Sequence, residues 1–324
     1  MNKTSVLNPL EKTQTPDENL SQSKLINDGL SFVILAIAII ALAFSPIFTK
    51  LSELELSPTA TIFNRFWIST IIVSCWQFVA TWRSEKVATP KSDLHRQETG
   101  LLILASFSAT ASALLWAISF TQTSIASSTV LRSLTPLFIG LGAWLILKQH
   151  FNNQFILGMA LAIIGAMVIG WDDLQLGNDY LVGDSIALLS AALHGVNILT
   201  VGYLRDRGCP TDRVLFWRCL VGFFIILPIT LLTDTQVFPL SLQGWLSVIA
   251  LAVVCQTLGQ GLLVFSLKQF SSSFVGIFAL LKPLVTALLA WIIFAEGINL
   301  ISGVALCLIL LGIYLAKSSE FSTQ

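Results

Sequence analysis

The sequence predicts an all-α integral membrane protein in which ten transmembrane helices form two inverted five-helix repeats. Three observations lead to this fold class: the composition, a series of long apolar runs, and an internal duplication. Hydrophobic residues make up 55% of the chain and charged residues 11%, whereas roughly 25% of the residues of a soluble domain are charged. With a mean hydropathy of +0.80, the chain is too apolar for an ordinary soluble fold.

The apolar runs follow one another from residue 31 almost to the end of the chain. Each is roughly 20 residues long, the length that crosses a hydrocarbon core of about 30 Å. A backbone exposed to lipid must satisfy its own hydrogen bonds, and these runs lack the alternation of barrel strands, so we expect helices. The ten runs lie at 31–49, 59–82, 101–121, 124–147, 154–171, 183–204, 211–233, 244–267, 272–294 and 299–316.

The duplication is clearest in two stretches, Ser133–Asn152 and Leu280–Asn299. A shift of 147 positions superposes them without a gap and pairs Pro136 with Pro283. Any two helices rich in leucine and alanine would look alike, but that alternative does not explain the matched proline, or the tryptophans at positions 144 and 291. We therefore expect a first repeat over residues 31–171 and a second over 183–316.

Lysine and arginine in the loops predict the orientation, because these residues prefer the cytoplasmic side. With both termini inside, the outer loops hold only Lys50. The inner segments hold Lys3, Lys12, Lys24, Arg83, Lys86, Lys91, Arg96, Lys148, Arg205, Arg207, Arg213, Lys268 and Lys317. Five spans are an odd number, so the second half enters the membrane from the opposite side and the repeats are inverted. The expected location is the plasma (inner) membrane, multi-pass, with cytoplasmic termini.

Residues 1–30 are polar and lack an apolar helical period, so we expect a disordered cytoplasmic tail. They also lack the basic start, apolar core and cleavage site of a secretory signal. The net charge is zero, which does not favour a nucleic acid as a partner. The expected partners are the lipid bilayer and a small-molecule substrate.

The chemistry of an enzyme or an ATP-driven pump is not predicted. No Gly-Lys pair occurs, so the phosphate-binding loop of such a pump is absent from the sequence. The five cysteines are scattered, without the spacing of a zinc site or a disulfide framework. No nucleophile stands beside a base or a metal cluster in the pattern. We therefore expect no enzymatic activity, no metal and no cofactor.

Four cations, Arg65, Arg132, Arg218 and Lys282, fall within the apolar runs. A charge at the centre of a helix in hydrocarbon costs roughly 2.5–3.5 kcal/mol on insertion scales, so such residues usually face a partner or a watery cavity. Lys282 lies deepest, beside Pro283; it could contact a ligand or bond to backbone carbonyls. For Arg65 and Arg218, snorkelling or loop anchoring is as good an explanation as binding. No carboxylate lies deep in a run, which disfavours efflux of a cation.

Further polar and aromatic side chains could line the same cavity as Lys282. Gln256 and Gln260 stand four residues apart on one helix face, and His194 lies at a similar depth. Hydrogen bonding between helices is an equal alternative for the glutamines, and packing is the commoner role for a lone histidine. Trp116 could wall the cavity or simply fill the core. Because proline interrupts the helical hydrogen-bond ladder, Pro136 and the equivalent Pro283 are expected to act as hinges.

Several motifs together resemble a known family. These are the Pro-to-Ala-Trp stretch that closes the fourth helix of each half, the segments Trp116–Leu131 and Gly183–Leu199, and the pair Arg65-Phe66. With the five-helix duplication, they are similar to the EamA-type ten-helix carriers of the drug/metabolite transporter superfamily. The resemblance implies transport of small metabolites, often amino acids or nucleosides, and in many cases export. Members of this family often carry a glutamate where this chain has Lys282.

The expected function is therefore a secondary transporter, an exporter or exchanger, that moves a small metabolite by alternating access. The intramembrane cations favour a substrate that is anionic or amino-acid-like. The alternative is a non-transporting membrane scaffold or sensor subunit. Such a protein would need the helices but not the buried charges, so the cations are the feature that separates the two hypotheses.

The distribution of loop cations generates a topological prediction. A cysteine introduced as Pro90→Cys, in the loop from Arg83 to Arg96, should be protected from a membrane-impermeant thiol reagent in intact cells and labelled after permeabilisation. A cysteine introduced as Leu54→Cys, in the short segment after Lys50, should be labelled in intact cells. Labelling of the Pro90→Cys variant from outside would overturn the orientation.

Overall fold

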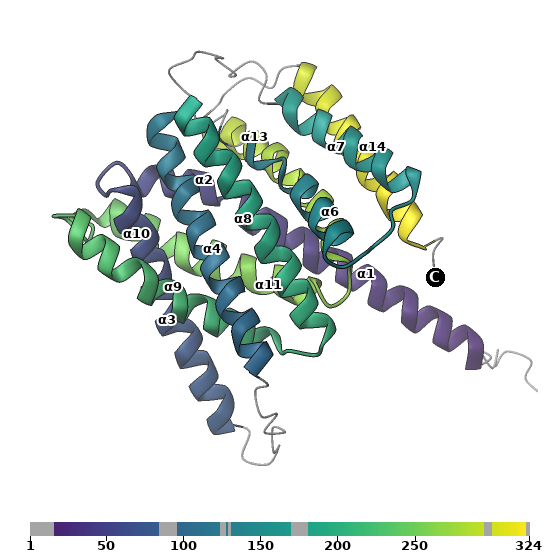
Figure 1. Cartoon of the computed structure of the whole chain (residues 1–324), viewed down its shortest axis with the longest axis horizontal. Coiled ribbons are helices and arrows are strands. Elements are labelled where there is room, and N and C mark those ends of the chain that lie inside the picture. Colours follow the sequence, from purple (N-terminus) through teal and green to yellow (C-terminus); the bar gives the residue numbers. More distant parts are fainter. Residues whose placement is uncertain are drawn as a thin grey trace, which may run out of the picture.

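The computed structural model describes residues 16–83, 96–123, 128, 131–169, 181–294 and 300–321, and within these ranges the chain forms helices joined by short turns, without a strand (Figure 1). The helices are α1 (Pro16–Ala43), α2 (Ser45–Ser52), α3 (Pro58–Arg83), α4 (Arg96–Gln122), α6 (Thr135–Leu145), α7 (Asn153–Ile169), α8 (Leu181–Asp206), α9 (Thr211–Thr233), α10 (Leu242–Ala250), the π-helix η3 (Leu251–Gly259), α11 (Gln260–Ser266), α12 (Ser272–Phe278), α13 (Leu281–Phe294) and α14 (Leu300–Phe321).

Apolar helices occupy the places of the ten predicted runs. Within the described residues, six helical segments are long and apolar enough to cross a membrane. They are Gly29–Ser52, Pro58–Val79, Gln97–Gln122, Leu181–Asp206, Thr211–Thr233 and Leu242–Ser266. Shorter apolar helices cover Thr135–Leu145, Asn153–Gly165, Ser272–Thr286 and Cys307–Ala316. The all-helical fold is thus confirmed, whereas the number of ten membrane crossings stays a prediction.

The first helix begins earlier than the sequence analysis expected. Residues 1–15 lie outside the described residues, but α1 already starts at Pro16, within the segment expected to be a tail. Proline suits the first turn of a helix. A polar segment that is too weak to fold alone can therefore extend the apolar helix that follows it.

Two helical spans are interrupted just before the paired prolines. A turn at Ser133-Leu134 precedes α6, and a turn at Ala279-Leu280 separates α12 from α13. Tighter hydrogen bonds to the third preceding residue close both turns, from Leu134 N to Leu131 O at 3.1 Å and from Lys282 N to Ala279 O at 3.0 Å. Proline lacks the N–H that would continue the regular ladder, which accounts for the position of the breaks.

The two halves pack against each other in a symmetric pattern. The helices at the second run of each half, α3 and α9, pack on each other. The helices at the fifth run of each half, α7 and α14, do the same. The contact of α4 with α8 likewise has an equivalent in the contact of α1 with η3 and α11. This pairing is what a two-fold relation between the halves would produce, because helices next to such an axis meet their own copies.

The backbones of α7 and α14, which lie side by side in Figure 1, approach each other closely where the two helices cross. A Cβ atom on Gly312 would lie 2.5 Å from Gly158 O and 2.7 Å from Ala162 N. A Cβ atom on Gly158 would lie 2.5 Å from Gly312 O. These contacts involve backbone atoms that cannot move aside, so both positions require glycine for the helices to meet.

This crossing yields a stability prediction. The variant Gly312→Val should have a free energy of unfolding lower by about 1–3 kcal/mol or more, the cost typical of overpacking, because its side chain collides with the α7 backbone. The matched control is Gly100→Val in α4, where nothing lies within 4 Å of an added Cβ. Thermal unfolding in detergent should give a clearly lower midpoint for Gly312→Val than for Gly100→Val. Equal midpoints would contradict the close approach.

Candidate functional site

A cavity of about 100 Å³ lies between the two halves, next to the breaks that precede Pro136 and Pro283. A cavity needs only about 10–15 Å³ on this measure to hold one water molecule. There is therefore room for several waters or a small metabolite. The walls come from α1 and α2, the middle of α3, α4, α8, α9, η3 with the start of α11, and the segments around the two breaks.

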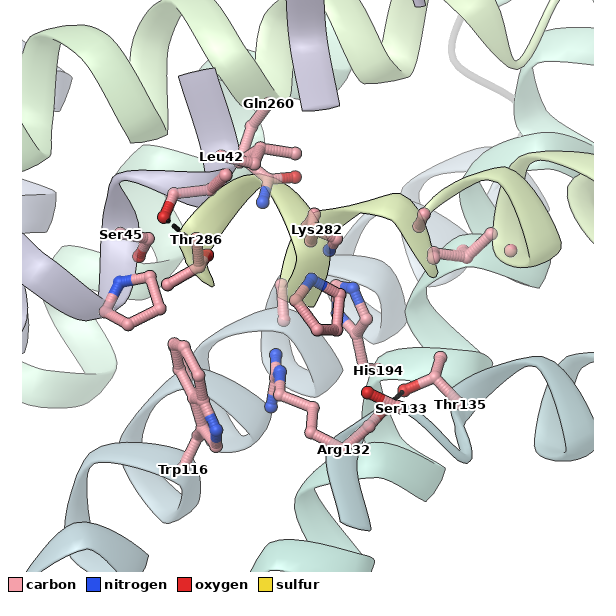
Figure 2. Close-up of a pocket in the computed structure, with 18 of the residues that line it drawn as sticks. Leu42, Ser45, Trp116, Arg132, Ser133, Thr135, His194, Gln260, Lys282 and Thr286 are labelled. Atoms are coloured by element: carbon pink, nitrogen blue, oxygen red, sulfur yellow. Dashed lines mark hydrogen bonds between the residues drawn. The ribbon is translucent and has the colours of Figure 1, made fainter. Parts of the chain in front are cut away.

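All the side chains that the sequence analysis selected line this one cavity. They are Arg65, Trp116, Arg132, His194, Arg218, Gln256, Gln260 and Lys282, together with the two prolines. Figure 2 shows Trp116 and Arg132 on one wall, with Gln260 and Lys282 on the facing wall. The arrangement brings residues far apart in the sequence to one place.

Arg132 is held in position by neutral partners from two helices. Its guanidinium lies 4.6 Å from the centre of the Trp116 ring, an arrangement in which the cation is attracted to the face of the ring. It donates to Ser190 Oγ on α8 and, at 3.5 Å, to Ser112 O on α4. The head group is therefore fixed in direction without a carboxylate.

Arg65 is held in a similar way at another part of the wall. Its Nε donates to Gln256 Oε1 at 2.8 Å, and the Gln256 amide in turn lies 3.9 Å from Cys219 Sγ on α9. Arg65 is 6% exposed and Gln256 1% exposed. For Gln256, the structure thus shows hydrogen bonding between helices in a residue that also lines the cavity, so the two alternatives of the sequence analysis coexist.

Several polar groups in the cavity wall have no partner within the described part of the chain. Arg218 Nε, Gln260 Oε1 and Trp116 Nε1 are buried atoms without a hydrogen bond. Arg218 is 5% exposed and Gln260 6% exposed, so bulk water does not reach most of either side chain. Buried polar groups are normally paired, and an unpaired one calls for an explanation such as a bound ligand or water.

The π-helix η3 places the two glutamines. It spans Leu251–Gly259, and its wider turn leaves Thr257 Oγ1 donating to Ala252 O at 2.9 Å. Gln256 lies inside it and Gln260 directly after it. Single π-turns are rare and frequently occur at functional sites. The sequence contains no signal for this feature, because no proline or glycine marks the start of η3.

The sequence analysis missed the contribution of α2. The first predicted span breaks between Ala43 and Ser45, and Ser45 and Pro46 line the cavity. Thr286 Oγ1 donates to the freed Ala43 O at 2.9 Å, a bond drawn in Figure 2. Pro46 was the available signal, since proline in an apolar run breaks the helix. Asn197, three residues after His194 on α8, donates to Ala105 O at 2.7 Å and is not among the residues that line the cavity.

Two carboxylates lie just beyond α2, outside the spans. Burial raises the pKa of the Glu53 carboxyl to about 7, and its Oε1 has no hydrogen-bond partner among the described residues. Glu55 instead accepts bonds from Leu240 N at 3.1 Å, Ser241 N at 3.2 Å and Ser241 Oγ. Hydrogen bonding to Ser241 is the main reason that the pKa of Glu55 lies below its ordinary value. Neither carboxylate lines the cavity.

Comparison with known proteins identifies the family. The model of the EamA-like transporter family matches residues 29–171 and again residues 181–317. The chain belongs to this family. Its two matches cover both halves of the fold, in agreement with the resemblance found in the motifs. The EamA-like protein is therefore a membrane transporter of the drug/metabolite type, in a family whose members are transporters rather than enzymes.

Solved structures support the same architecture for this EamA-like protein. One of them, described only as "Crystal structure of protein", matches with a TM-score of 0.75 and 16% sequence identity. The match covers 89% of this chain and 97% of the other. At this identity the likeness concerns the fold alone. None of the curated proteins compared with the chain matches it.

The Arg65–Gln256 bond generates a prediction on stability. Gln256→Leu should lower the free energy of unfolding by about 1.5–3 kcal/mol, because a buried guanidinium loses its hydrogen-bond acceptor. Gln260→Leu is the control: Gln260 Oε1 has no partner within the described residues, so its loss should cost less. Combining Gln256→Leu with Arg65→Met should cost less than the sum of the two single changes. Additive losses in thermal unfolding would show that the pair is not coupled.

Proposed function

We propose that the protein is a secondary transporter that carries a small organic anion by alternating access, as an exporter or exchanger in the plasma (inner) membrane with both termini cytoplasmic. One observation carries the proposal. Four cations, Arg65, Arg132, Arg218 and Lys282, line a single cavity, and within the described residues none of them forms an ion pair with a carboxylate.

A substrate anion would supply the charge that the cavity lacks. Burying an uncompensated cation is costly, and a carboxylate or phosphate that accepts charge-assisted hydrogen bonds offsets that cost. Arg132 is well suited to this task, since its guanidinium is already oriented by Trp116 and Ser190. A planar guanidinium presents several donors in a fixed geometry, which matches the oxygens of a carboxylate. An organic cation would instead be repelled.

The position of the breaks supports alternating access. The shift of 147 positions pairs Arg132 with Ala279, Ser133 with Leu280 and Pro136 with Pro283, and all six residues line the cavity. The wall therefore contains two equivalent interruptions, one from each half. If these interruptions act as hinges and exchange their conformations, the cavity would open alternately to the two sides of the membrane.

In the proposed transport cycle, hydrogen bonds between Glu55 and the start of α10 act as one gate. Glu55 follows α2 in the first half, and its carboxylate accepts three bonds from Leu240 and Ser241 at the start of α10 in the second half. An anion is stabilised at the N-terminus of a helix by the helix dipole. Opening of the cavity at this end would require these bonds to break.

The transport prediction compares wild type with Lys282→Gln in proteoliposomes. At least one of labelled lactate, malate and glycerol 3-phosphate should exchange through the wild-type protein, and the organic cation tetraethylammonium should not. Lys282→Gln should raise the KM for the transported anion by about tenfold or more, since a charge-assisted hydrogen bond contributes roughly 1.5–3 kcal/mol. Its unfolding midpoint should not fall, because the change removes an unpaired buried charge. Lys268→Gln is the matched control, because Lys268 is exposed and lies outside the cavity.

Two outcomes would contradict the proposal. Transport of tetraethylammonium in preference to the anions would overturn the charge argument. A folded protein that moves none of the probes would favour the alternative of a scaffold or sensor subunit. An unchanged KM in Lys282→Gln would show that Lys282 does not bind the substrate, and the binding role would then fall to the three arginines.

A further inference from the structure

Gln260 adds a requirement that the cations alone do not impose. Its side chain is 6% exposed and lines the cavity, and its Oε1 is buried without a hydrogen-bond partner among the described residues. Figure 2 shows its amide directed into the cavity from the same wall as Lys282. A carboxamide oxygen accepts hydrogen bonds and cannot donate them. This point on the wall therefore needs a donor from whatever fills the cavity.

The neighbouring glutamine shows that this state is specific to Gln260. Gln256 is equally buried and lines the same cavity, but its Oε1 accepts from Arg65 Nε at 2.8 Å. The acceptor oxygen of Gln256 is thus hydrogen-bonded within the protein, whereas that of Gln260 has no partner among the described residues.

The charge of the cavity restricts the kind of donor. An ammonium group would bring positive charge into a cavity lined by Arg65, Arg132, Arg218 and Lys282, at close range in a medium of low dielectric constant. A hydroxyl group donates a hydrogen bond without adding charge, and its lone pairs can accept from a cation at the same time. Trp116 Nε1 and Arg218 Nε, two further unpaired groups, are both donors, and they suit additional ligand oxygens.

We propose that the substrate is a hydroxylated small organic anion, and that Gln260 selects it by accepting a hydrogen bond from the hydroxyl group while the cations bind the anionic group. The inference rests on the proposed function and deepens it. A plain carboxylate leaves Gln260 Oε1 buried and unpaired, and a zwitterionic amino acid places its ammonium among the cations. The anionic group is a carboxylate or a phosphate ester, since both offer oxygens to Arg132.

The expected selectivity follows from the unpaired acceptor. A site built to bond a substrate hydroxyl rejects an analogue that lacks it, because the analogue displaces water without replacing its hydrogen bond. For one neutral acceptor we expect a preference of about 10- to 100-fold. Proteoliposomes should therefore take up lactate in preference to propionate, malate in preference to succinate, and lactate in preference to alanine. Glycerol 3-phosphate should likewise be preferred over propyl phosphate, and comparing glycerol 3-phosphate with lactate distinguishes a phosphate ester from a carboxylate.

The variant Gln260→Leu tests whether Gln260 is the selecting residue. It should reduce the lactate-to-propionate and malate-to-succinate ratios to near one, chiefly by lowering uptake of the hydroxylated member of each pair, while the unfolding midpoint does not fall. A purely structural role would change stability and lower all uptake together. The matched control is Gln243→Leu on α10, where the glutamine is exposed and outside the cavity; both ratios should be unchanged there.

The outcomes separate this inference from the proposed function. If anions are transported but wild type shows no preference for the hydroxylated member of either pair, the hydroxyl requirement is overturned and the anion carrier stands. If Gln260→Leu keeps the wild-type ratios, Gln260 is not the selecting residue and the inference fails. Preference for alanine over lactate overturns it as well. If none of the anions moves, the proposed function itself fails.

Discussion

The rest of the structure depends on placing four positive charges inside an apolar helical protein. Hydrocarbon does not solvate a guanidinium or an ammonium group, so each must face protein dipoles, water or a counter-ion. Arg132 contacts the face of the Trp116 ring and donates hydrogen bonds to serine oxygens, and Arg65 donates to Gln256. These neutral partners orient the cations without cancelling their charge. The cavity is left positive, which is the property that an anionic substrate would use.

Irregular backbone creates the cavity in which this charge can be kept. The spans break at Phe44, at Ser133-Leu134 and at Ala279-Leu280, and η3 widens a fourth segment. Non-helical backbone is tolerated at membrane depth only where it is buried in protein or lines a watery space. The bond from Thr286 Oγ1 to Ala43 O satisfies one freed carbonyl. The interruptions and the charges therefore belong to one site, and the tight crossing of α7 with α14 lies apart from it.

Much of the candidate site could be predicted because its polar residues stand within apolar runs of the sequence. A charged or amide side chain in an apolar run is conspicuous because lipid penalises it, so the sequence alone indicates Lys282, Arg132 and Gln260. The paired prolines were recognisable because duplication repeats them. Ser45 and Thr286 were not, since small hydroxyl groups are common in membrane helices and their role depends on which carbonyl lies nearby. The start of α1 at Pro16 was also missed, because helix extension by polar residues depends on the helix that follows.

By itself, the sequence determined the helical membrane fold, the duplicated halves, the transporter family and the set of intramembrane cations, because hydropathy and internal similarity act along the chain. Tertiary structure alone decided which polar groups satisfy each other. Gln256 and Gln260 are indistinguishable by residue type and environment in the sequence, yet only Gln256 meets Arg65, which comes from α3. That difference arises from the wider turn of η3 and from packing between the halves. Pairing across such distances is a property of three-dimensional proximity, which one-dimensional periodicity does not encode.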